Sequence, residues 1–100
     1  MDYRLVWSDT ATLDLKEIVQ FIATDNQDAA LNFGSLIIDK LEQVVPHPYS
    51  GRIVPEEKNE LVRELILSSY RIVYEIEKDH GIIHILRIWH SSRGKLKLAS

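Results

Sequence analysis

Arginine and histidine side chains gather in the last third of the chain, in and just after its most apolar stretch. Residues 68–93 read SSYRIVYEIEKDHGIIHILRIWHSSR and contain three arginines and three histidines. Guanidinium groups bind carboxylates and phosphates through paired hydrogen bonds, and imidazole exchanges a proton near neutral pH. Residue types of this kind can dock an anionic partner or take part in proton transfer.

The alternation of residue types predicts where three of these side chains lie. The even positions of 70–76 are apolar and share one face of the expected strand, so Arg71 lies on the other face. His90 and Arg93 follow the last apolar run, where the chain leaves the sheet. We therefore expect these three residues to form a functional surface on or beside a sheet face that no helix covers. The alternative for Arg71 is a surface ion pair with Glu75 along the same strand.

Periodicity in the rest of the chain predicts the elements that position this surface. The expected elements are a strand at 3–7, two amphipathic helices within 9–45, and strands at 61–67, 70–77 and 82–89. Ser8 or Asp9 is expected to cap the first helix and Asp28 the second. Pro46 and Pro48 end the second helix, because proline cannot donate a helical hydrogen bond.

The order β-α-α-β-β-β predicts an α+β fold for residues 1–100 as one domain. A helical hairpin should pack on one face of a small, mainly antiparallel sheet, because the three later strands are joined by short turns. The run 82–89 is apolar at both odd and even positions except for His84 and Arg87. That pattern suggests a central strand and leaves the direction of Arg87 undecided. The segment 46–60 is expected to be a polar loop.

Composition excludes several classes of protein. The chain has 45% hydrophobic and 27% charged residues and no cysteine, and it lacks an apolar run near the ~18 residues of a membrane helix. Its first ten residues do not resemble a secretory signal, so a cytoplasmic location is expected. Four scattered histidines predict no metal site, and no glycine-rich phosphate loop or other cofactor motif is present.

Charge is distributed unevenly along the chain. Residues 1–60 contain 11 acids and 5 bases, whereas residues 61–100 contain 7 bases and 4 acids. The basic half is therefore the expected docking surface for an acidic partner. The overall isoelectric point of 5.7 weighs against docking on the ribosome, because proteins that bind RNA gain much of their affinity from cations that neutralise phosphates.

Five segments in order resemble the RelE/ParE superfamily of toxins from bacterial type II toxin-antitoxin modules. They are WSDTATLDLKEIVQFI, AALNF, PYSGRIVPE, VRELILSSYRIVYEI and ILRIWHSSR, and together they span nearly the whole chain. The GRIVPE loop, the Arg63-Glu64 pair and the RIWHSSR ending look closer to the ParE branch. The resemblance links that branch to inhibition of DNA gyrase, whereas the RelE branch cleaves messenger RNA on the ribosome.

For a RelE-like enzyme, the resemblance implies catalytic roles for the three residues of the expected surface. Arg71 stands where RelE-type toxins keep a catalytic arginine, which would stabilise the charged transition state. His90 and Arg93 would then supply proton transfer and phosphate binding. Two departures argue against this branch: no tyrosine follows the last strand, and the loop before the second expected strand lacks the lysine pair of that branch and offers Glu56, Glu57 and Lys58.

The resemblance therefore implies a ParE-like toxin that binds DNA gyrase and is neutralised by a cognate antitoxin. We expect a binding protein rather than an enzyme, with contact to DNA only through the antitoxin complex. The candidate target-binding residues are Arg63, Arg71, Arg87, His90 and Arg93. The alternatives are a RelE-like mRNA interferase, with ribosome and messenger RNA as partners, or an inactive toxin relic that only binds antitoxin.

Overall fold

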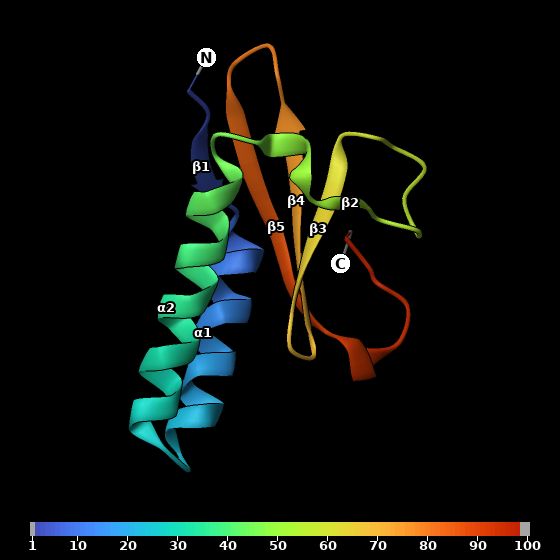
Figure 1. The fold of residues 1–100 in the computed structure, drawn as a ribbon. Helices are drawn as coiled ribbons and strands as arrows, with labels where there is room; N and C mark the ends of the chain where they lie inside the picture. The colour runs from blue at the N-terminus through green and yellow to red at the C-terminus, as the bar shows by residue number, and fades with distance from the viewer. Residues whose placement is uncertain (1, 99–100) are drawn as a thin grey trace.

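The computed structural model describes residues 2–98 and contains two helices that pack on one face of a sheet (Figure 1). The elements in chain order are β1 (Arg4–Trp7), α1 (Asp9–Ala23), α2 (Gln27–Val44), the 3-10 helix η1 (Pro48–Ser50), β2 (Arg52–Ile53), β3 (Val62–Leu67), β4 (Tyr70–Glu77), β5 (Ile82–His90) and the 3-10 helix η2 (Ser91–Arg93). The predicted α+β class and helical hairpin are confirmed. The short strand β2 is an addition within the expected loop.

The five strands lie in the order β1-β5-β4-β3-β2, and only the β1–β5 pair is parallel. Strand β5 is thus internal, as its apolar character suggested. Its register against β4 shifts between Val73 and Tyr74, which lie opposite Arg87 and Ile85 and leave Leu86 as an extra residue. At a bulge of this kind the odd and even positions of the strand exchange faces, so odd residues face the core on one side of the bulge and even residues on the other. This reversal explains why β5 is apolar at both odd and even positions.

Both helices begin at side-chain caps. Ser8, one of the two expected caps, accepts a hydrogen bond from the Ala11 N–H at 3.0 Å. The prediction of Asp28 for α2 is wrong, because Asn26 has the extended backbone of a cap and accepts from the Ala29 N–H at 3.0 Å. Asp28 lies instead in the first turn of α2, where its carboxylate interacts favourably with the helix dipole. Neither helix of the described chain is long and apolar enough to cross a membrane.

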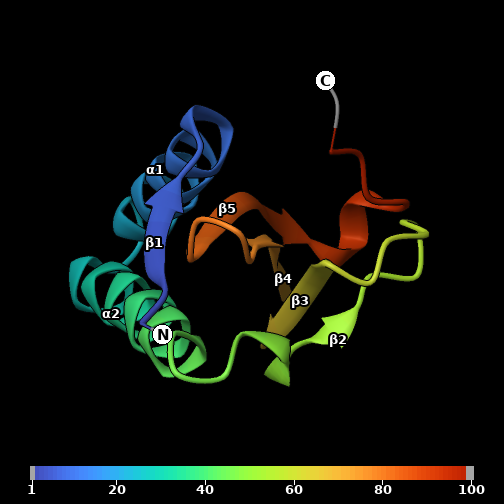
Figure 2. The ribbon, with the colours of Figure 1, turned by 90° about the horizontal axis from the view of Figure 1, so that it is seen from above.

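Each face of the sheet has its own apolar cluster. The cluster under the helices includes the even positions of β4, as predicted, and comprises Ala11, Ile37, Leu41, Val44, Ile72, Tyr74, Ile76, Ile83, Ile85 and Ile88. The opposite face was expected to be uncovered, and that expectation is wrong. There Val73 and Trp89 of the sheet pack with Val54 of the loop and Leu96 of the C-terminal segment, residues 94–98 (Figure 2).

Tyr74 fixes the segment that leads into β2. Its buried hydroxyl donates to the Pro48 carbonyl at 2.7 Å and accepts from the Gly51 N–H at 3.0 Å. Burial raises the pKa of this hydroxyl, which keeps the donating proton in place. A Cβ atom at Gly51 would collide with the hydroxyl and lie 2.8 Å from the Glu64 carbonyl oxygen. Glycine is therefore needed here for close approach rather than for backbone freedom.

Two glycine-to-alanine substitutions should have opposite effects on stability. Gly51→Ala should lower the free energy of unfolding by roughly 1–3 kcal/mol, because the added methyl overpacks a buried site. Gly34→Ala is the control: a Cβ there meets no atom within 4 Å, and alanine should raise helix stability by up to about 1 kcal/mol. Urea unfolding at neutral pH measures both. Equal stabilities of Gly51→Ala and the wild type would contradict the close contact.

Candidate functional site

Arg71 lies in a chain of ion pairs on the sheet face opposite the helices. Its Nε donates to Glu64 at 2.6 Å, and its Nη1 and Nη2 each donate to Glu56 at 2.7 Å. Glu64 also accepts from the Nε of Arg52 at 2.6 Å. The side chain of Glu64 is 0% exposed and that of Arg71 is 11% exposed. The chain of charges joins β2, β3 and β4 to the loop between β2 and β3.

The same contacts keep the charges ionised. Hydrogen bonds from Arg71 lower the pKa of Glu56 to about 2, although partial burial opposes this effect. Hydrogen bonds from Glu56 raise the pKa of Arg71 above its ordinary value. Glu56 also accepts from the Leu96 N–H at 3.1 Å, which attaches the C-terminal segment to the network. An ionised Glu56 thus holds two parts of the chain together.

The position of Arg71 differs from both sequence-based expectations. It is neither an exposed arginine on an open face nor the partner of Glu75, since its ion pairs are with Glu56 and Glu64. Glu64 instead meets a cation on each neighbouring strand, Arg71 on β4 and Arg52 on β2. The guanidinium donors that would recognise a phosphate are therefore directed at carboxylates of the chain itself.

Arg87 joins the sheet to α1. Its Nε and Nη2 donate to the two carboxylate oxygens of Asp14, at 2.9 and 3.0 Å, and its Nη1 donates to the Lys97 carbonyl at 3.2 Å. Asp14 also accepts from the Ile88 N–H at 3.0 Å. Strand β1 pairs with β5 only as far as Ile85. Asp14 therefore satisfies a backbone donor of β5 beyond the end of β1, and Arg87 balances its charge.

Arg63 binds the segments on both sides of β2. Its Nε donates to the Glu60 carbonyl at 2.7 Å, and its Nη1 donates to the carbonyls of Tyr49 and Gly51 at 3.1 Å each. The guanidinium carbon also lies 5.2 Å from the centre of the Tyr49 ring. Arg63 thus donates its hydrogen bonds to carbonyl groups of the chain itself.

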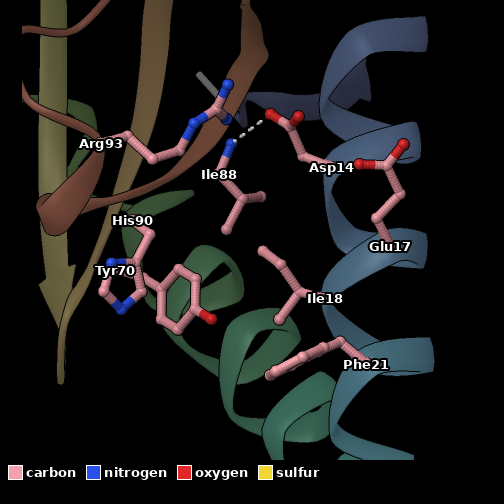
Figure 3. A pocket seen from close by; sticks show the side chains of 8 residues that line it. All are labelled: Asp14, Glu17, Ile18, Phe21, Tyr70, Ile88, His90 and Arg93. Carbon is pink, nitrogen blue, oxygen red and sulfur yellow. Dashed lines mark hydrogen bonds between the residues drawn. The ribbon is translucent and has the colours of Figure 1, made fainter.

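His90 and Arg93 meet at a pocket between α1 and β5 (Figure 3). The pocket has a volume of about 220 Å³ and is lined by Asp14, Glu17, Ile18, Phe21, Tyr70, Ile88, His90 and Arg93. Arg93 stacks on Trp89, with its guanidinium carbon 4.1 Å from the ring centre. Phe21, at the other side of the pocket, is 76% exposed. The pocket thus combines exposed apolar surface with a cation held in place by an indole ring.

The orientation of His90 is set by its neighbours. Its Nδ1 accepts from the Ser92 N–H at 3.0 Å, so the neutral imidazole carries its proton on Nε2. The ring packs edge-on against Tyr70, with centroids 4.9 Å apart, and Tyr70 in turn packs against Phe33 at 5.0 Å. His90 is therefore a fixed donor beside an aromatic wall.

The register places Arg71 and His90 on opposite faces of the sheet. Tyr70 lies opposite His90, and Arg71 lies opposite Trp89. Because neighbouring residues of a strand point to opposite faces, His90 shares the helix-covered face with Tyr70. The structure brings His90 and Arg93 together at one pocket and leaves Arg71 in the ion-pair chain. Among residues 2–98, no three histidine or carboxylate side chains are grouped as metal ligands would be.

Several residues of these sites were not singled out from the sequence as members of a site. Glu17, Phe21 and Tyr70 line the pocket, and Asp14 completes the pair with Arg87. A signal for Asp14 existed: it lies on the buried stripe of α1, three residues after Ala11 and one before Leu15. An aspartate at an otherwise apolar stripe position requires a buried partner.

Comparisons with known proteins agree on the fold and the family. Residues 5–94 match the family model described as the ParE toxin of type II toxin-antitoxin system, parDE. A structure of the chromosomal ParDE TA system from P. aeruginosa is similar, with 22% identity, a TM-score of 0.70, and coverage of 88% of this chain and 95% of that one. The RelBE2 toxin-antitoxin complex from Mycobacterium tuberculosis is also similar, with 19% identity, a TM-score of 0.58, and coverage of 90% of this chain and 99% of that one. No curated protein sequence matches.

The buried ion-pair chain predicts that Arg71→Ala is destabilising. Removal of Arg71 leaves Glu56 without its main partner and Glu64 with one cation, so the free energy of unfolding should fall by roughly 3 kcal/mol. Arg52→Ala is the matched control: the Arg52 side chain is 61% exposed and Glu64 keeps its ion pair with Arg71 in this variant, so the loss should be at most about 1 kcal/mol. Urea unfolding compares the two. Equal, small losses would show that the chain of charges adds little stability.

Glu56 should make stability depend on pH in the acid range. Its pKa is about 2 in the folded protein, against an ordinary value of 4.5 for a glutamate. Its contribution to the free energy of unfolding is therefore fully present above about pH 4.5 and is lost as the pH falls toward 2. Glu56→Gln should be less stable than wild type at pH 7, and the two should converge near pH 2. Unfolding free energies measured across this range test the prediction, and a constant difference would contradict it.

Proposed function

This chain belongs to the ParE toxin family of type II toxin-antitoxin systems, and we propose that it inhibits growth by binding DNA gyrase rather than by cleaving RNA. The observation that supports the proposal is the position of Arg71 between Glu56 and Glu64. A phosphate bound there would have to displace two carboxylates, one of them fully buried. A protein target can bind elsewhere on the surface without displacing these carboxylates.

The other candidate residues point the same way. The RelE-like interpretation requires Arg71, His90 and Arg93 around one phosphate, whereas Arg71 lies on the face of the sheet opposite His90. The likeness to the RelBE2 structure, at 19% identity, concerns the fold and carries no catalytic residue to this chain. A RelE-like mRNA interferase is therefore the outcome that the experiment below must exclude.

The proposed target-binding surface centres on the pocket between α1 and β5. His90, Arg93 and the exposed Phe21 offer a donor, a cation and an aromatic side chain within one surface. Interfaces gain most of their affinity from anchors of this type. In this proposal Arg63, Arg71 and Arg87 support the surface through their contacts within the chain and do not contact the target.

A cognate antitoxin is the second proposed partner. The two similar structures come from toxin-antitoxin systems. In the C-terminal segment, Leu96 is buried whereas Lys95 and Lys97 are exposed. Arg93 precedes them and stacks on Trp89, which belongs to the same apolar cluster as Leu96. We propose that an acidic stretch of the antitoxin covers these cations and extends over the pocket, and that the complex meets DNA through the antitoxin.

Controlled expression with separate reporters for DNA damage and for translation tests the target. We expect a DNA-damage response while translation continues. A variant with His90→Ala and Arg93→Ala should bind gyrase at least about tenfold more weakly, because it loses two central contacts, while its melting temperature stays close to that of wild type. Lys58→Ala, an exposed cation in the loop before β3, is the control and should remain toxic.

Rapid loss of translation with cut transcripts would contradict the gyrase proposal and support an mRNA interferase. In that case His90→Ala should abolish cleavage while binding to the ribosome persists. Full toxicity of the double variant would move the target-binding surface away from the pocket.

A further inference from the structure

The outer side of the helical hairpin carries a second apolar surface. Helix α2 buries Ala30, Ile37, Leu41 and Val44, of which the last three belong to the cluster against the sheet. A further stripe points outward, where Leu31 is 70% exposed and Ile38 is 39% exposed. Between the two helices lies a hollow of about 380 Å³, here called the hairpin groove, lined by Leu15, Val19, Ala30, Leu31, Gly34, Ser35, Ile38 and Asp39.

Gly34 gives this groove room for close approach. A Cβ atom at Gly34 would meet no atom within 4 Å, so packing within the described chain does not require glycine there. Glycine in the middle of a helix costs roughly 0.5–1 kcal/mol relative to alanine. Because glycine has no side chain, the backbone of another helix can approach α2 closely at this position. The distance along α2 from Leu31 to Ile38 is about 10 Å, two turns of helix.

The rim of the groove is acidic. Residues 9–44 contain seven acids and two bases. Asp39 lines the groove, Glu42 follows Ile38 by one turn, and Asp28 precedes Leu31 by just under one turn. Lys16, next to Leu15 on α1, and Lys40, next to Asp39 on α2, are the two bases of this range, so carboxylates outnumber cations around the groove. Apolar side chains with flanking carboxylates favour a partner whose apolar stripe is flanked by cations.

Charge also decides between possible occupants. In a symmetric pair of two copies the same surface meets itself, so Asp39 and Glu42 of one copy would face those of the other. An acidic antitoxin stretch would meet the same repulsion. The hairpin lies on the side of the sheet away from β2 and the C-terminal segment (Figures 1 and 2). The groove is thus separate from the cations proposed to bind the antitoxin.

We propose that the hairpin groove binds a basic amphipathic helix of a partner protein. The helix lies across Gly34, places leucine-type side chains spaced at i, i+3, i+4 and i+7 against Leu31 and Ile38, and directs lysine or arginine toward Asp39 and Glu42. This interaction goes beyond the proposed function, because neither gyrase binding through the pocket nor antitoxin binding through the C-terminal segment uses this surface.

A pair of synthetic peptides tests the proposal with the full-length protein. One labelled helical peptide of about 18 residues, five turns, has leucines at the spacing above and lysines elsewhere; the other has glutamate in place of every lysine. Fluorescence anisotropy should show micromolar binding of the lysine peptide and at least about tenfold weaker binding of the glutamate peptide. A variant with Asp39→Lys and Glu42→Lys should reverse this preference.

Substitutions on α2 locate the binding site. Gly34→Trp should fill the groove and weaken binding of the lysine peptide by about tenfold or more, whereas Gly34→Ala should retain it. Leu36→Ser is the control, since Leu36 is exposed but does not line the groove. Thermal melting verifies that each variant is folded. Equal binding of both peptides, undiminished binding by Gly34→Trp, or a dimer of the free protein that Gly34→Trp dissolves would each overturn the proposal.

Discussion

The guanidinium of Arg71 is the constraint on which one whole face of this protein depends. A charged group removed from water must be paired, and here the partners come from different places in the chain: Glu64 on the adjacent strand and Glu56 in the loop before it. The loop must therefore return across the sheet, and it brings Val54 into the second apolar cluster. Glu56 then offers an oxygen to the Leu96 N–H. One arginine thus organises a strand, a loop and the end of the described chain.

Most of the fold was predictable because it follows from regular patterns. The stripes of α1 and α2 and the alternation of β4 each repeat over two or more turns or pleats, so a single misplaced residue does not hide them. The bulge at Leu86 was not predictable, because an extra residue in a run of apolar residues looks the same as a strand buried on both faces. The cap of α2 was misplaced by two residues, since Asn26 and Asp28 both have suitable side chains.

The site was predicted in part, for a related reason. His90 and Arg93 are close in sequence and leave the sheet together, so their shared position follows from local chain direction. The short turn between β3 and β4 places Glu64 and Arg71 on neighbouring strands, whereas Arg52 lies on the short strand β2, within a segment expected to be a loop. The contact of Arg71 with Glu56 spans an irregular loop, and no periodic pattern reports which loop residue turns inward. The pairing of Asp14 with Arg87 spans almost the whole chain and becomes visible only when α1 is placed against β5.

The C-terminal segment is attached to the sheet largely through its own backbone. The Gly94 carbonyl accepts from the Trp89 indole at 3.3 Å, the Leu96 N–H donates to Glu56, and the Lys97 carbonyl accepts from Arg87. Backbone groups are the same for every residue except proline, so the attachment does not depend on the side chains at positions 95 and 97. Outward-facing residues here can change by mutation without loss of the fold. The surface that positions 95 and 97 present can therefore change in charge and shape while the scaffold stays constant.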